Sequence, residues 1–248
     1  YYTLPEGWEP KVSATEFDDM MWYKTMKKTH YMETLIKQHG AIMDQYDPEK
    51  KIGMIIDEWG TWFACEEGTN PGFLYQQNTM RDALVAGINL NIFNKNCDRV
   101  KMANLAQMVN VLQAVILTEG KDMILTPTYH VFDLYKYHQD ADLVESNIEV
   151  TQIGLDEENK VPNLTESTSV TKDGTIHITI TNCSLDESYT IDGIFAETTI
   201  HKISGRILQN EARAYNSFDC PEKIKIEEFT TYQKTEKGLQ FTIPACSV

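Results

Sequence analysis

The spacing of apolar residues changes near residue 140, and no other feature restricts the possible folds as much. Before that point, helical spacing predicts helices within residues 15–43, 79–95 and 103–117. Two short aliphatic runs, at residues 51–56 and 98–103, lie between these segments, and the unbroken first run predicts a strand buried on both faces. Alternating helices and strands of this kind indicate an α/β arrangement with parallel strands.

Beyond about residue 145, apolar and polar residues alternate with a period of two. The clearest examples are residues 175–182, 222–229 and 239–243. The turn dipeptides are Asp173-Gly174, Asp192-Gly193 and Lys237-Gly238. Short strands broken by such turns predict an antiparallel sandwich. Because no low-complexity linker separates the two parts, we expect the join between them to be packed.

Charge and composition argue against several classes of partner. The formal net charge of −15 disfavours nucleic acid and anionic membrane surfaces, because both attract a surplus of lysine and arginine. No apolar run reaches the roughly 18 residues that suggest a membrane-spanning helix. Five dispersed cysteines without a CxxC pair predict free thiols in a reducing compartment, which favours a cytoplasmic over a secreted protein. The opening residues resemble neither a start methionine nor a signal segment, so we expect the sequence to begin within a longer protein.

The run at residues 51–56 leads directly into Asp57 and Glu58, and then into Trp59 and Trp62. Sites in α/β folds are built where parallel strands end, and aromatic rings beside a carboxylate suit a sugar. Neighbours on a strand point to opposite faces, so we expect one catalytic carboxylate here, Glu58. A glycosidase needs a second carboxyl group, which must come from elsewhere. Alternatively, Glu58 only caps a turn at the end of the strand.

Two histidines, His130 and His138, raise the question of a metal site. They lie eight residues apart and no third ligand accompanies them, so we expect no metal and no cofactor.

Three segments carry a resemblance to a known family. They are DEWGTWF at residues 57–63, residues 68–117, and LTPTYHVFDLYKYHQDA at residues 125–141, with the opening residues 1–18 fitting as well. Together they resemble the C-terminal half of an α-L-arabinofuranosidase of glycoside hydrolase family 51.

The resemblance implies a fold of two parts. Residues 1–120 would be the C-terminal portion of a (β/α)8 TIM barrel, containing the end of strand six and strands seven and eight. Residues 121–248 would be an antiparallel, jelly-roll-type β-sandwich. The full-length enzyme would be a homo-oligomer.

The resemblance also implies an activity: retaining hydrolysis of terminal non-reducing α-L-arabinofuranosyl residues in arabinosides and arabinose-containing hemicellulose. The partner would be an arabinofuranosyl-containing oligo- or polysaccharide. Glu58 would be the nucleophile, with Tyr2 hydrogen-bonded near it and Gln107 binding the sugar. Trp59 and Trp62 would belong to the barrel rim or lie beside the substrate.

One part of the family pattern is missing. The general acid/base should follow an asparagine at the end of the fourth barrel strand, but the one Asn-Glu pair, Asn210-Glu211, lies in the predicted sandwich. We therefore expect a fragment that lacks the acid/base and is inactive alone. The alternative is a non-catalytic carbohydrate-binding or oligomer-forming module. A serine hydrolase is disfavoured because the Gly-x-Ser-x-Gly motif is absent.

Overall fold

The computed structural model describes residues 1–196 and 200–248. The helices are α1 (Asp19–Tyr46), α2 (Met80–Lys95) and α3 (Pro127–Tyr135), with two 3₁₀ turns, η1 (Pro71–Phe73) and η2 (Lys136–His138). The strands are β1 (Tyr2–Thr3), β2 (Met54–Thr61), β3 (Val100–Leu105), β4 (Ile116–Glu119), β5 (Asp122–Leu125), β6 (Asp142–Val144), β7 (Gln152–Ile153), β8 (Val161–Pro162), β9 (Leu164–Val170), β10 (Ile176–Asn182), β11 (Tyr189–Ile194), β12 (Gly205–Ile207), β13 (Glu227–Phe229), β14 (Tyr232–Lys234) and β15 (Gly238–Ile243).

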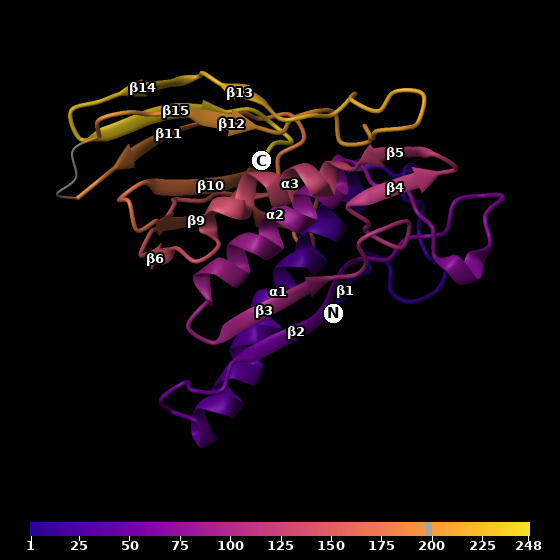
Figure 1. Cartoon of the computed structure of the whole chain (residues 1–248), viewed down its shortest axis with the longest axis horizontal. Coiled ribbons are helices and arrows are strands. Elements are labelled where there is room, and N and C mark those ends of the chain that lie inside the picture. The colour runs from indigo at the N-terminus through magenta and orange to yellow at the C-terminus, as the bar shows by residue number, and fades with distance from the viewer. Residues whose placement is uncertain (197–199) are drawn as a thin grey trace.

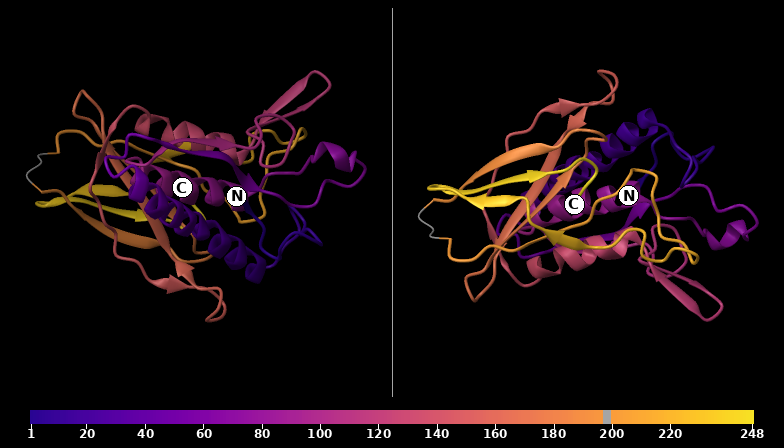
Figure 2. Two further views of the ribbon diagram at one scale, coloured as in Figure 1. Left: turned by 90° about the horizontal axis from the view of Figure 1, so that it is seen from below. Right: turned by 90° about the horizontal axis from the view of Figure 1, so that it is seen from above.

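The strands after residue 140 form the predicted β-sandwich. Two antiparallel sheets, ordered β10-β9-β6 and β11-β15-β14, make its main layers, with β12 and β13 paired beside them. In Figure 1 the second sheet lies above the first, with α3 beside the first sheet and α1 extending beneath it. Figure 2 shows α1 in front when the molecule is seen from below and the sandwich strands in front when it is seen from above. The alternation of apolar residues after residue 145 therefore indicated the correct fold class for this part.

The strands before residue 110 form a parallel sheet in the order β1-β2-β3. One face packs on the helices through residues such as Met54 and Ile56. The other face is open, since Ile55 is 54% exposed and Met102 is 53% exposed. The prediction that residues 51–56 are buried on both faces is therefore wrong for this chain. The strand begins only at Met54, and the described residues cover one of its faces.

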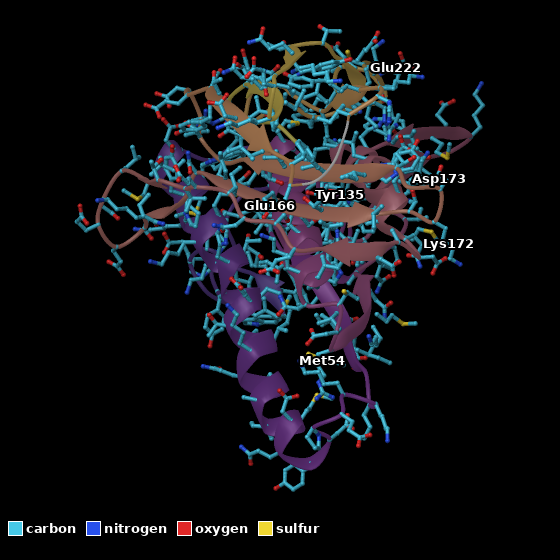
Figure 3. All side chains as sticks on the ribbon, turned by 90° about the vertical axis from the view of Figure 1, so that its left-hand side faces the viewer. Met54, Tyr135, Glu166, Lys172, Asp173 and Glu222 are labelled. Carbon is cyan, nitrogen blue, oxygen red and sulfur yellow. The ribbon has the colours of Figure 1, made fainter. Side chains whose placement is uncertain are left out.

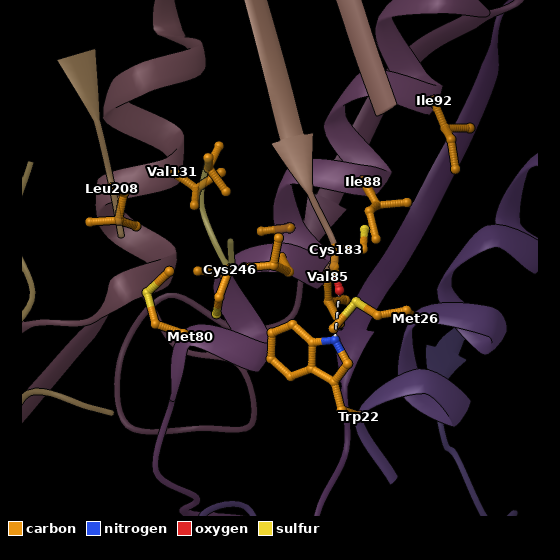
Figure 4. Packing of buried hydrophobic residues seen from close by; sticks show 14 of the residues in the cluster. Trp22, Met26, Met80, Val85, Ile88, Ile92, Val131, Cys183, Leu208 and Cys246 are labelled. Atoms are coloured by element: carbon orange, nitrogen blue, oxygen red, sulfur yellow. Dashed lines mark hydrogen bonds between the residues drawn. The ribbon is translucent and has the colours of Figure 1, made fainter. Parts of the chain in front are cut away.

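Helix α2 lies at the centre of the molecule and joins the two parts. Thr79 and Asp82 form a reciprocal capping box at its start, and most of its residues are buried, as its apolar sequence predicts. One hydrophobic cluster runs from α1 through α2 into the sandwich, and Figure 4 shows its packing. Within it, the Trp22 indole N–H donates to the carbonyl oxygen of Cys183 at 2.9 Å. This continuous core confirms that the join is packed.

Buried polar side chains also hold α2 against the sandwich. The Asn91 carbonyl oxygen accepts hydrogen bonds from the hydroxyls of Ser167 at 2.9 Å and Thr179 at 3.0 Å. Its amide nitrogen donates to the Thr165 hydroxyl at 3.0 Å. Tyr135 of α3, labelled in Figure 3, also bonds to α2, because its hydroxyl donates to the Gly87 carbonyl oxygen at 3.1 Å. Since buried polar groups are costly when unpaired, this network specifies how the helix and the sheet fit together.

His138 ties the end of η2 to the same sheet. Its two ring nitrogens lie 2.7 Å from the Ser169 hydroxyl and 3.0 Å from the Thr179 hydroxyl. Burial, with a smaller contribution from nearby His177, lowers the pKa of His138 to about 4. The ring is therefore neutral at physiological pH and serves the packing of β9 and β10.

The depressed pKa of His138 predicts a pH-dependent stability. Between pH 6.5 and 4 the unfolded chain binds a proton at this residue and the folded chain does not, so acid favours unfolding. Allowing for partial solvent exposure, we expect His138 to lower the unfolding free energy by about 1 kcal/mol between pH 7 and pH 5. Chemical denaturation of the wild type and His138→Gln at both pH values measures this difference. An identical pH dependence in the two proteins would contradict the prediction.

Three other sequence predictions need correction. Residues 103–117 are not a helix: β3 ends at Leu105, and Asn110 and Leu112 have positive φ values of 59° and 52° that interrupt any helix. Asp192-Gly193 is not a turn but lies within β11, paired with Leu239 and Gln240 of β15. Of residues 222–229, only the last three form a strand. Local spacing could not distinguish these cases because long-range pairing decides them.

Candidate active site

The carboxylates after the aliphatic run lie at an irregularity in β2. Ile56 pairs with Ala103 and Trp59 pairs with Leu105, so Asp57 and Glu58 together lie opposite the single residue Asn104. An extra residue of this kind is a β-bulge, which re-aims side chains and is common beside active sites. Asp57 and Glu58 are both exposed and line the same hollow. The register shift at this point means that the regular alternation assumed from the sequence does not hold between Ile56 and Trp59.

Tyr2 lies directly beside Glu58. Strand β1 pairs in parallel with β2, with Tyr2 opposite Gly60, and the Tyr2 hydroxyl donates to Glu58 Oε2 at 3.0 Å. Burial, together with the hydrogen bond to the Glu58 carboxylate, raises the pKa of Tyr2 to about 12. The phenol therefore stays protonated at neutral pH and remains available as a donor. Two of the residues singled out in the sequence are thus in contact although they lie 56 positions apart.

Glu58 opens into a broad hollow of about 1060 Å³. Residues 53–58 of the β2 segment form one wall, and the α1 residues that line it include Leu35, His39 and Ile42. The hollow lies between the β2 segment and α1 and is open to solvent rather than enclosed. Among the residues that line the hollow, Asp57 and Glu58 are the two that carry a carboxylate.

The two tryptophans after Glu58 have different surroundings. Trp59 is 0% exposed and packs in the core, with its ring centroid 5.4 Å from that of Phe93 and 6.1 Å from that of Phe132. Trp62 is partly exposed and meets the Tyr2 ring edge-on at 5.0 Å. The structure therefore brings Trp62 to the Tyr2–Glu58 pair and directs Trp59 away from it.

Gln107 lies in a second hollow. It is exposed just beyond the end of β3 and lines a depression of about 590 Å³ together with Phe73, Tyr75 and Asn110. This depression does not include Glu58 among its lining residues. The structure thus leaves Gln107 near the carboxyl ends of the strands but outside the hollow that Glu58 lines.

The described residues contain neither a cluster of metal ligands nor a membrane-spanning helix. Residues 1–196 and 200–248 hold no group of three or more histidine, cysteine, aspartate or glutamate side chains placed to bind a metal ion. No helix in this part of the chain has the length and apolar character needed to span a membrane.

Residues 57–247 match the family described as the α-L-arabinofuranosidase C-terminal domain. The chain belongs to this family. It is also similar to known members of glycoside hydrolase family 51. It is 43% identical over its whole length to an intracellular exo-α-L-arabinofuranosidase from Bacteroides ovatus, of which it covers 48%.

Solved arabinofuranosidase structures agree with this assignment. The family 51 enzyme from Xanthomonas axonopodis pv. citri is 44% identical, with a TM-score of 0.97 over the whole of this chain and 50% of that one. A family 51 arabinofuranosidase from Bifidobacterium longum, 20% identical with a TM-score of 0.80, shares the fold. The chain spans about half the length of the relatives that it matches.

Proposed function

We propose that this chain is the C-terminal half of a retaining exo-α-L-arabinofuranosidase in which Glu58 is the nucleophile. The observation that carries the proposal is the hydrogen bond between the Tyr2 hydroxyl and Glu58 Oε2, at a bulge in a parallel sheet. A carboxylate held by a phenolic donor keeps one oxygen oriented while the other is free to react.

The reaction would proceed in two displacements. Glu58 would attack the anomeric carbon of a terminal arabinofuranosyl group, the bond to the leaving oxygen would break, and a covalent glycosyl-enzyme would form. Water would then release arabinose with retained configuration. Asp57 adjoins Glu58 and cannot lie across the scissile bond from it, where a retaining pair stands about 5 Å apart. We therefore propose that the general acid/base comes from the part of the enzyme outside this chain.

The open sheet supports a proposal for the parent fold. We propose that β1, β2 and β3 correspond to the end of strand six and to strands seven and eight of a (β/α)8 barrel within residues 1–120. Closing a barrel would cover the exposed Ile55 and Met102 with the side chains of further strands. Residues 121–248 would then form the separate, jelly-roll-type sandwich domain.

The relatives suggest where the enzyme acts and on what. Several bear names that describe intracellular exo-acting arabinofuranosidases, including one from Halalkalibacterium halodurans named for α-(1→5) linkages. We propose that the parent of this chain likewise acts inside the cell on arabinofuranosyl-containing oligosaccharides, as a homo-oligomer without nucleic-acid or membrane partners. Gln107, at the end of β3, is proposed to bind a sugar hydroxyl once the barrel is complete.

A non-catalytic carbohydrate-binding or oligomer-forming module is the second candidate. It is favoured by the absence of a second suitably placed carboxylate from the lining of the Glu58 hollow. Assaying the full-length protein with an aryl α-L-arabinofuranoside separates the two candidates. Release of arabinose supports the enzyme, whereas binding of the arabinoside without turnover supports the module.

Tyr2→Phe tests the contact that carries the proposal. The variant keeps the ring against Trp62 but removes the donor to Glu58, so kcat/KM of the full-length enzyme should fall by roughly ten-fold to a hundred-fold. Tyr1→Phe is the matched control, because the Tyr1 hydroxyl donates instead to the Lys28 carbonyl oxygen at 2.8 Å. Equal kcat/KM values for the two variants would count against the role of Tyr2.

A further inference from the structure

Three contacting aromatic side chains, Tyr2, Trp62 and Trp8, form an aromatic chain that leads from Glu58 to the surface. The Trp62 ring that meets Tyr2 also meets the Trp8 ring, with centroids 4.8 Å apart and the planes inclined at 65°. Trp8 lies in the loop after β1, and Trp62 directly follows β2, so both stand at the carboxyl ends of parallel strands. Trp8 is 57% exposed. A path of contacting side chains therefore leads from the carboxylate to an open indole.

Lys11 holds this indole in place. Its ammonium lies 4.3 Å from the centroid of the Trp8 ring and 5.1 Å from that of Trp62. The same group donates to the Trp8 carbonyl oxygen at 3.0 Å and to the Glu9 carboxylate at 2.9 Å. A cation thus lies over the ring of Trp8 while more than half of the residue stays open to solvent. An oriented, half-open ring of this kind is pre-organised for stacking.

We propose that Trp8 is the platform for the sugar unit that leaves when the arabinofuranosyl bond is cleaved. The inference rests on the proposed function of Glu58. A terminal arabinofuranosyl ring at Glu58 would direct the rest of the substrate outward along the strand ends, past Trp62 and onto Trp8. The C–H face of a sugar ring packs well on an indole. Trp8 would therefore determine specificity for the leaving group.

The charges around the platform indicate the type of sugar. The Lys11 charge is paired with Glu9, and Lys24 of α1 is paired with Glu6 of the loop after β1. Asp57 and Glu58 add negative charge near the other end of the aromatic chain. With both lysines paired to glutamates and two further carboxylates nearby, the surface fits a neutral sugar unit, such as arabinose or xylose, better than a uronate.

The test compares two substrates whose leaving groups differ in whether they can contact Trp8. An α-L-arabinofuranosyl fluoride leaves a single atom, whereas a linear arabinotriose leaves a disaccharide that can stack. In the full-length enzyme, Trp8→Ala should reduce kcat/KM about ten-fold more for the trisaccharide than for the fluoride. Trp8→Phe, which retains a ring, should recover most of this difference. Tyr46→Ala, which removes another aromatic that is 86% exposed on α1, should leave the ratio of the two kcat/KM values as in the wild type.

The outcomes separate this inference from the proposal on which it rests. If the wild-type enzyme turns over the fluoride, an equal loss of kcat/KM on both substrates in Trp8→Ala, or no loss on either, would overturn the role of Trp8 as a platform. Failure of the wild-type enzyme to release arabinose from either substrate would overturn the proposed function and the platform with it. A melting temperature of Trp8→Phe equal to that of the wild type ensures that the ratio reports on binding rather than on folding.

Discussion

Glu58→Gln should lower turnover of arabinofuranosides by the full-length enzyme by roughly three orders of magnitude or more, since an amide is a poor nucleophile. The substitution preserves size and the Tyr2 contact, so the loss should come from the chemistry rather than from the fold. Mass spectrometry with a slowly released substrate should detect a covalent glycosyl-enzyme on the wild type and none on the variant. Turnover close to the wild-type rate would refute the assignment of Glu58.

Two controls make this result specific. Asp57→Asn removes the same charge from the neighbouring exposed residue and should retain far more activity than Glu58→Gln. Glu58→Ala leaves space for a small anion, so added azide should attack the anomeric carbon directly and give the product of inverted configuration. A retained product from azide, or an equal loss of activity in Asp57→Asn, would point to a different nucleophile.

Trp59→Ala should have the largest effect on stability. Trp59 is fully buried between Phe93 and Phe132, so truncation would remove a large apolar side chain and leave a cavity. Such substitutions cost about 3–5 kcal/mol of unfolding free energy. Chemical denaturation at fixed pH measures the loss. A change below about 1 kcal/mol would mean that the core at this position can collapse.

A milder variant separates packing from catalysis at this position. Trp59→Phe keeps an aromatic ring in the core and should lose distinctly less stability than Trp59→Ala. If Trp59 serves the core alone, folded Trp59→Phe enzyme should keep a near-normal kcat/KM. A large loss of kcat/KM with intact stability would instead mean that Trp59 also affects substrate binding or catalysis.

Much of the fold could be predicted from residue spacing. Helical spacing predicted a helix within residues 79–95, and α2 forms there and is buried on most sides. The alternation at residues 175–182 and 239–243 indicated β10 and β15. These predictions succeeded because the buried face of a helix or strand needs apolar residues at the spacing of that element, about 3.6 or 2 residues. The segment after β3 was mistaken for a helix because an apolar run carries no information about the positive φ values that break it.

Less of the candidate site was accessible in this way. The order of residues pointed to Glu58 at the end of a strand, and the family resemblance pointed to Tyr2. The sequence did not reveal the bulge that exposes Asp57 together with Glu58, because the extra residue is defined only by its pairing with Asn104. Nor did it reveal Trp8, whose position in a loop has no periodic signal.

The sequence by itself determined the type of most main elements and the family of the chain, because local spacing reports the first and ordered runs of residue types report the second. Only the tertiary structure decided which side chains meet. The contacts of Glu58 with Tyr2, and of Trp62 with Trp8, join strands and loops that are distant in the chain. Their geometry depends on the register of β1, β2 and β3 and on the helices packed behind them, and a shift of one residue would turn each side chain to the other face.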